Sequence, residues 1–246
     1  MSKTVLTNVR CFAVGADLTS NSNKIELSSE VEAKDSTNYG SQGWKEVVGG
    51  IASAELSGEG QWEAFDTTKV DDASWAQLGG VGPWSVSANN AANVGDLAYL
   101  MSALRSDYKL FGEVGEVAPW SGTAKSAWPL VRGQFAHPPG TARTATGTGT
   151  GLNLGAVAVN KRMYASLHVL SVAGTATPTI TARVESSVDN TFASPTTRLT
   201  FTAATAVGGQ ILRTAGPAIT DTWWRVAWTI SGTSPSFLFA AAFGIG

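Results

Sequence analysis

The chain has 246 residues, of which 43% are hydrophobic and 15% charged, and its formal net charge is −2. Average soluble domains carry about 25% charged residues. Nine Trp and nine Phe indicate a packed interior and exclude a highly charged disordered polymer. The single cysteine, Cys11, excludes an intrachain disulfide framework and a cysteine-based zinc cluster.

The near-neutral total predicts no bulk affinity for nucleic acid or membranes. Acidic and basic residues are nevertheless unevenly distributed along the chain. Residues 1–120 carry 16 acidic and 8 basic side chains, a balance of −8, whereas residues 121–246 carry 3 acidic and 9 basic ones, a balance of +6. This asymmetry indicates either an oriented surface that joins copies head to tail or a drift in surface composition, and both interpretations stay open.

The N-terminal residues lack the apolar core of a secretory signal. No stretch approaches the ~18 apolar residues of a membrane-spanning helix. We therefore expect a protein that is made and kept in a cytoplasm or assembled into a particle there.

Two long stretches near the N-terminus alternate between polar and apolar residues, which is typical of half-buried strands. Residues 24–34 place Ile25, Leu27, Val31 and Ala33 on one face and Lys24, Glu26, Ser28, Glu30, Glu32 and Lys34 on the other. Residues 51–64 alternate small or apolar residues with Ser, Gln and Glu. Both predicted strands exceed the usual five or six residues and present an acidic outer face.

Glycine, asparagine and serine in residues 35–50 predict a long loop between these strands. A short helix is expected near residues 70–78, ended by Gly79 and Gly80. Apolar residues at three- and four-residue spacing predict a second helix over residues 94–106, with Asn93 as its N-cap. So little helix excludes a doubly wound parallel sheet.

The rest of the chain reads as strands separated by glycine and proline turns, which favours a sandwich or barrel. The expected strands are 109–118, 128–136, 152–159, 162–172, 178–186, 197–204, 208–214, 222–230 and 236–245. Residues 140–151 are low in complexity and predict a linker, loop or arm. We expect a first β domain over 1–150 and a β-rich C-terminal domain over 151–246, or one intertwined domain.

Catalytic and metal-binding motifs are missing from the sequence. His137 and His168 lack metal-ligand spacing, so structural roles are favoured. Cys11 has no base nearby in sequence and reads as a small buried residue. Glu113 and Glu116 fall on opposite faces of one expected strand and cannot converge for glycosidase chemistry. The sequence predicts no enzyme and no cofactor.

Five tryptophans could suggest sugar binding by ring stacking: Trp120, Trp128, Trp223, Trp224 and Trp228. In residues 222–230, however, Trp224, Val226 and Trp228 share one face with Ile230, which is typical of a core strand. A core position is therefore the better interpretation for most of them.

The chain resembles the major tail proteins of long-tailed bacteriophages, which form the tail tube. The similar stretch is residues 24–65, KIELSSEVEAKDSTNYGSQGWKEVVGGIASAELSGEGQWEAF, with its order of strand, glycine-rich loop carrying Lys and Trp, and long acidic strand. The expected helix over 94–106 also resembles the family, as do the β-rich segments TPTITARVESSVDNTF, TRLTFTA and TWWRVAWTISGTSPSFLFAAAFGIG. The long second half goes beyond a minimal tube subunit.

This resemblance implies a mainly β fold, a tail-tube-like sandwich or barrel with one flanking α-helix and a C-terminal all-β part. It implies a virion protein of a non-contractile tail, assembled in the host cytoplasm as stacked homohexameric rings around a channel for DNA ejection. Its partners would be other copies, the tail terminator, the tape measure and the distal tail protein. The genome would pass without specific binding.

A channel for DNA needs a polar lining that does not grip phosphates, and carboxylates meet that need. The lumen-lining candidates are Glu26, Glu30, Glu32, Glu55, Glu59 and Glu63, although an ordinary solvated outer face is the alternative. The candidates for inter-subunit contact are Trp44 and Lys45 in the first loop and Arg143 and Thr146 in the low-complexity segment. The competing function is a tail-tip or capsid-decoration β-sandwich that binds a host saccharide.

Overall fold

The computed structural model describes residues 6–66 and 69–246, and in this part of the chain one short α-helix accompanies a large β-sheet. The sheet runs in the order β12-β11-β14-β8-β6-β5-β1-β2, with β3, β4 and β7 joined to it through β6. All pairings between these strands are antiparallel, and the sheet does not close into a barrel. The expected mainly β fold is confirmed.

Along the chain, the elements are β1 (Arg10–Ala13), β2 (Ala16–Asp17), η1 (Thr19–Asn21), β3 (Ser22–Asp35), η2 (Tyr39–Ser41), β4 (Val47–Gln61), α1 (Val70–Gln77), β5 (Val81–Ser87), β6 (Leu97–Leu110), β7 (Pro119–Ser126), β8 (Val131–His137), β9 (Gly147–Thr148), β10 (Leu152–Asn153), β11 (Met163–Ser187), β12 (Thr196–Thr200), β13 (Gly208–Arg213) and β14 (Trp223–Ile245). The expected helix near residues 70–78 is confirmed as α1.

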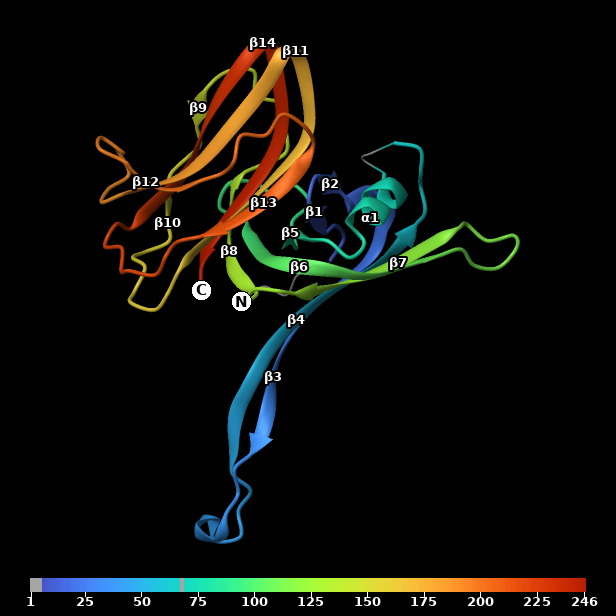
Figure 1. The fold of residues 1–246 in the computed structure, drawn as a ribbon, viewed down its shortest axis with the longest axis vertical. Coiled ribbons are helices and arrows are strands. Elements are labelled where there is room, and N and C mark those ends of the chain that lie inside the picture. Colours follow the sequence, from blue (N-terminus) through green and yellow to red (C-terminus); the bar gives the residue numbers. More distant parts are fainter. Residues whose placement is uncertain (1–5, 67–68) are drawn as a thin grey trace.

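Figure 1 shows a body of two parts, with one long hairpin extending away from it. The first part packs around Trp84, Met101 and Trp120. The second is dominated by the β11–β14 hairpin, whose core includes Trp224 and Phe237. A smaller cluster, which includes Phe12, Phe135 and Leu170, joins the two parts. The division at residue 150 stays a prediction.

The helix expected over residues 94–106 is wrong, because most of that segment belongs to strand β6. The middle of β6 is covered on both faces, with Leu100 in one cluster and Met101 in another. Burial on both sides removes the alternation that marks a half-buried strand, so the apolar spacing imitates a helix. Asn93 begins a turn instead, in which its N–H donates to Asp96 at 2.7 Å.

Several expected strand limits also differ from the structure. Residues 111–118 form a loop rather than the expected strand, and β7 follows it. Glu113 and Glu116 therefore lie in a loop and not on two faces of a strand. The expected strands 162–172 and 178–186 are one continuous β11, and 222–230 and 236–245 are one β14. Of the expected strand 152–159, only the short β10 is formed.

Both histidines are buried and hydrogen-bonded. His168 donates from Nδ1 to the carbonyl of Val14 at 2.7 Å and accepts from the Ser85 hydroxyl at 2.8 Å, joining β11 to β1 and β5. Ser85 in turn bonds Ser166 at 2.8 Å. Because these groups are fully buried, this hydroxyl–imidazole pair is closed to any substrate.

His137 also has partners at both ring nitrogens. It bonds the Phe239 carbonyl at 3.0 Å and accepts from Arg143 at 3.0 Å, while its ring stacks on Phe239. Burial lowers the pKa of both His137 and His168 to about 4, so the networks need neutral rings.

These low pKa values predict that acid destabilises the fold. An unfolded histidine takes up a proton near its ordinary pKa of 6.5, whereas the folded ones do so only near pH 4. Their contribution to stability is therefore complete above pH 6.5 and declines as the pH falls from 6.5 to 4, by about 1.4 kcal/mol per pH unit for each ring. Denaturant unfolding at several pH values measures this slope.

His168→Gln is the matched control, because glutamine keeps a donor and an acceptor but does not titrate. We expect it to reduce the slope by about 1.4 kcal/mol per pH unit. An unchanged slope in the variant would contradict the assignment to His168.

Candidate assembly interface

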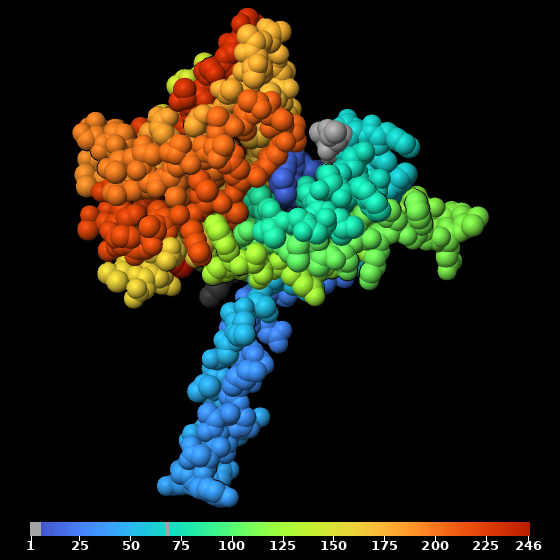
Figure 2. Space-filling model, in the orientation of Figure 1, coloured from blue at the N-terminus to red at the C-terminus, as the bar shows by residue number. Residues whose placement is uncertain are grey.

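Strands β3 and β4 form a hairpin that extends beyond the body, and we call residues 22–61 the arm (Figure 1). The space-filling view shows that most of its length lies free of the rest of the chain (Figure 2). An isolated two-stranded hairpin is marginally stable in water. The arm is therefore the part of the fold that most needs a further contact.

The arm is held at its root, where β4 is paired on both edges. One edge pairs with β3, and the other pairs with β7 from Glu55 to Gln61. The indole of Trp120 on β7 donates to the Asn21 carbonyl at 2.8 Å. A side chain at Gly60 would come within 1.7 Å of the same carbonyl, so the strands can approach this closely only with glycine there. From Ala54 toward the tip of the arm, β4 no longer pairs with β7.

The tip of the arm has a defined local structure. Asn38 caps the short helix η2, because its side chain accepts from Gly40 N–H at 2.8 Å and its own N–H donates to Ser41. Across the strands, the Glu46 N–H donates to the Thr37 hydroxyl at 2.9 Å. Hydrogen bonds from Thr37 lower the pKa of Asp35 below its ordinary range. The tip is thus shaped by its own sequence before any partner is present.

Large apolar side chains on the outer half of the arm are exposed. Trp44 is 81% exposed and Ile51 is 80% exposed. The other members of this set are Val31, Tyr39, Val47 and Val48. Exposed apolar groups gathered on one projection mark a protein contact. Of these residues, only Trp44 is a contact candidate from the sequence. Val47 and Val48 fall in the loop expected over 35–50, although two adjacent valines are the sequence feature that could have indicated an exposed strand there.

The acidic candidates divide into three groups. On β3, Glu26 and Glu30 lie opposite Ser57 and Ser53. On β4, Glu55 and Glu59 lie opposite Ser28 and Lys24, on the same side of the hairpin. Glu32 lies past a bulge and pairs with Lys34. Glu63 follows the end of β4 and pairs with Lys69 at 2.6 Å. Four of the six glutamates therefore share one face, and a luminal position for them stays a prediction.

Lys24 lies within this acidic face. Its ammonium is 3.2 Å from Glu26 and 3.3 Å from Glu59. The hydrogen bond with Glu26, followed by that with Glu59, raises the pKa of Lys24. Glu30 has no ion pair among the described residues and is exposed. The face is thus partly neutralised by Lys24, and Lys125 on β7 lies opposite Glu55 on the same face.

The remaining contact candidates occupy two different environments. Lys45 is exposed at the tip, 3.9 Å from Asp35. Arg143 instead lies against the body, with its backbone paired to Phe237 and its guanidinium over the Trp228 ring. The Ile230 N–H donates to the Thr146 hydroxyl at 3.0 Å. Within the chain, residues 140–151 are docked along β14, and a contact with another copy stays a prediction.

The described residues offer no group of three His, Cys, Asp or Glu side chains that could hold a metal ion. No helix in that part of the chain is long and apolar enough to cross a membrane. The expected burial of Cys11 is confirmed, and burial raises its pKa to about 12. A surface hollow of about 640 Å³ is lined in part by Arg10 and Asp17, which already pair with each other.

The different environments of the two loop segments predict different susceptibility to trypsin. The free subunit should be cleaved after Lys45, which lies on the unsupported tip, much sooner than after Arg143, whose backbone is paired on β14. Mass spectrometry of a digestion time course measures both rates. Comparable rates would contradict the docking of residues 140–151.

No protein-family model matches the sequence, and no curated protein matches it. Some solved structures are similar in part. A chain of the "Virion of native gene transfer agent (GTA) particle" is 22% identical, with 52% of this chain and 97% of that chain covered and a TM-score of 0.43. A chain of the GTA particle tail with C6 symmetry is 23% identical, with 50% and 92% covered and a TM-score of 0.39.

The Dit protein of phage SPP1 is 10% identical, covers 97% of this chain and 99% of its own, and has a TM-score of 0.35. The first of these neighbours comes from a GTA virion, the second from the tail of an empty GTA particle, and the third is described as a hub of the adsorption apparatus. At these sequence identities and TM-scores, the solved structures assign no role to any residue of this chain.

Proposed function

We propose that this chain is a structural subunit of the tail tube of a long-tailed phage or a related particle. Copies join as stacked, six-membered rings around a channel through which the genome leaves. The observation that carries the proposal is the arm, which exposes Trp44 and Ile51 on a hairpin without support from its own body. A monomer gains nothing from such a projection, whereas a copy packed against it gains both apolar burial and backbone partners.

The free edge of β3 strengthens this proposal. Within the described chain, β3 pairs only with β4, so its outer edge over Ser22–Asp35 has unpaired backbone groups. A long open edge is a template for adding a strand from another chain. Successive copies that pair along this edge would continue the sheet around a ring and close it as a barrel.

The acidic face of the arm supplies the chemistry of the proposed channel. Glu26, Glu30, Glu55 and Glu59 lie on one face, and such carboxylates repel the phosphates of a passing duplex. The competing receptor-binding function has less support, because Trp120, Trp224 and Trp228 are buried in the cores rather than gathered on a sugar-binding surface.

Shortening the arm tests the assembly. We replace residues 32–51 by Asn-Gly, which joins the cross-strand neighbours Val31 and Ala52 through a two-residue turn. The removed segment is almost entirely exposed, so the melting temperature should change by less than about 3 °C. Electron microscopy should show rings or tubes for the parent protein and none for the variant. Tubes from the shortened protein would refute this role of the arm.

Changing the acidic face tests the channel. Lysine at Glu26, Glu30, Glu55 and Glu59 should give tubes that retain duplex DNA, with a retention that falls steeply as salt rises. Glutamine at the same four positions removes the charge without adding cations and should leave DNA unretained. Assembled tubes are mixed with labelled duplex and sedimented. Equal retention by the lysine and glutamine variants would exclude a luminal position for this face.

A further inference from the structure

A second hairpin, formed by β6 and β7, ends in an acidic and apolar tip. In residues 111–118, which we call the side tip, Phe111, Val114 and Val117 are 69%, 106% and 69% exposed. Glu113 and Glu116 are also exposed there and form no ion pair within the described chain. No Lys or Arg occurs between Lys109 and Lys125. The side tip therefore carries two uncompensated carboxylates among three exposed apolar side chains.

A basic cluster lies in the second part of the body, and we define the socket as Lys161, Arg162 and Arg213. Arg162 donates to the Thr214 carbonyl at 3.0 Å, directly after Arg213 in the chain. The backbone of Arg162 pairs with Gly246, and Arg213 lies opposite Tyr164 in the pairing of β13 with β11. The start of β11 and the end of β13 therefore bring these cations together.

The socket has no internal counterion. None of its three cations forms an ion pair with any described residue. Between Glu116 and Glu185 the sequence contains no Asp or Glu. By contrast, Arg183 and Arg225, elsewhere on the same hairpin, are both neutralised by Glu185. The chain thus pairs some arginines internally and leaves the socket free.

The socket also has an aromatic floor. The Arg213 guanidinium lies 4.6 Å from the centre of the Trp128 ring, and that ring packs edge-on against Tyr164 at 6.2 Å. Trp128 is half-buried. Charge and apolar surface occur together here, as they do on the side tip.

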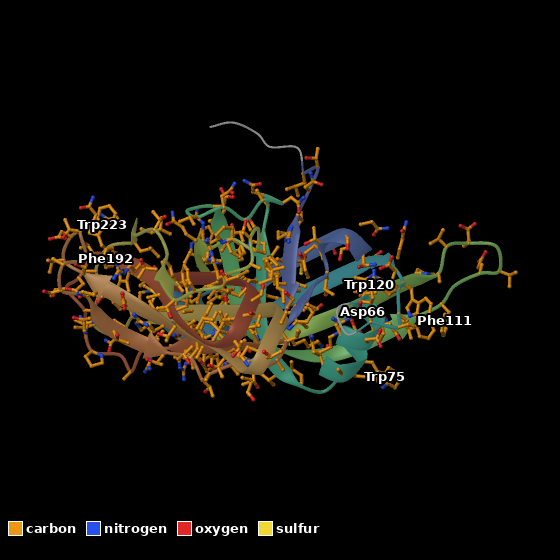
Figure 3. The ribbon with its side chains drawn as sticks, turned by 90° about the horizontal axis from the view of Figure 1, so that it is seen from above. Asp66, Trp75, Phe111, Trp120, Phe192 and Trp223 are labelled. Atoms are coloured by element: carbon orange, nitrogen blue, oxygen red, sulfur yellow. The ribbon has the colours of Figure 1, made fainter. Side chains whose placement is uncertain are left out.

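We propose that the side tip of one copy docks into the socket of the next copy around the ring. This inference rests on the proposed tail-tube function and names a lateral contact for it. The side tip, close to the labelled Phe111, and the C-terminal end beside the socket lie on different sides of the body, so the tip of a copy does not reach its own socket (Figures 1 and 3).

Contacts between two different patches close into rings when the rotation between copies permits. Complementary charge then selects the register and orientation of the contact. The acidic face of the arm is the weaker match for the socket. Lys24 already neutralises Glu26 and Glu59 on that face, and Lys34 pairs with Glu32. Glu113 and Glu116 have no lysine partner and stand beside exposed apolar groups that the aromatic floor can receive.

Charge reversal provides the first test. E113K/E116K makes the side tip basic, and K161E/R213E makes the socket acidic. Each variant alone should need a concentration about tenfold or more higher for ring assembly, measured by sedimentation and electron microscopy. An equimolar mixture of the two should assemble again, because each variant's tip then meets a complementary socket on the other. E30K, which changes the arm and leaves the side tip acidic, is the control: mixed with K161E/R213E, it should not restore assembly of that variant.

Thermal unfolding of each soluble variant shows that it is folded before assembly is scored. If the folded single variants assemble like the parent, or if their mixture stays unassembled, the lateral contact is wrong. Socket variants that lose binding to duplex DNA, while ring assembly is unaffected, would overturn it in favour of a nucleic-acid site.

Disulfide trapping separates this inference from the proposed function. V114C/K161C places one thiol on the side tip and one in the socket, whereas Cys11 is buried and unreactive. Oxidation should give a ladder of crosslinked chains, and V114C alone should give at most dimers. Assembly of the double variant without a ladder overturns the lateral contact but leaves the tube subunit intact. A ladder without rings or tubes supports the contact and counts against the tube, and a parent protein that stays monomeric overturns both.

Discussion

Backbone pairing along both edges of β4 is the constraint on which the architecture of the first part depends. Over Glu55–Gln61 the strand is held between β3 and β7, and past Ala54 only β3 remains. The same strand is therefore part of the sheet at one end and part of an isolated ribbon at the other. The change occurs where β7 ends at Ser126, whose hydroxyl accepts from the Ala54 N–H at 2.9 Å, whereas the Trp120–Asn21 bond and Gly60 hold the root of the arm. Every property of the arm, from its exposure to its need for a partner, follows from that point.

The two parts of the body differ in how they use charge. The second part neutralises Glu185 with two arginines and Asp221 with Arg198, close to its core. More than half of the acidic residues in 1–120 lie on projections, the arm and the side tip. A net charge of −2 hides this arrangement completely. Repulsion between the acidic projections and attraction toward basic surfaces would both weaken with salt, so ionic strength acts on assembly far more than on the fold.

Sequence patterns located β3 and β14, through the alternation in residues 24–34 and around Trp224 and Trp228. The half-buried strand expected over 24–34 is wrong for its outer half, because Val31 and Ala33 are exposed on the arm. The same reasoning failed at Leu100 and Met101, because burial on both faces of β6 produces a helical spacing. Side-chain patterns also do not predict the docking of residues 140–151, because backbone hydrogen bonds hold β9 against β14. The socket could not be predicted, because Arg162 and Arg213 come from separate segments that only the pairing of β11 with β13 brings together.

The placement of residues 140–151 has a consequence for how copies can polymerise. Gly147 and Thr148 pair with Trp228 and Ala227, so the chain caps this edge of β14 with its own backbone. The long edge of β3 is left uncapped. The capped stretch of β14 cannot accept a strand from another copy. Strand addition is therefore directed away from the second hairpin at this point and toward edges that stay open, such as that of β3.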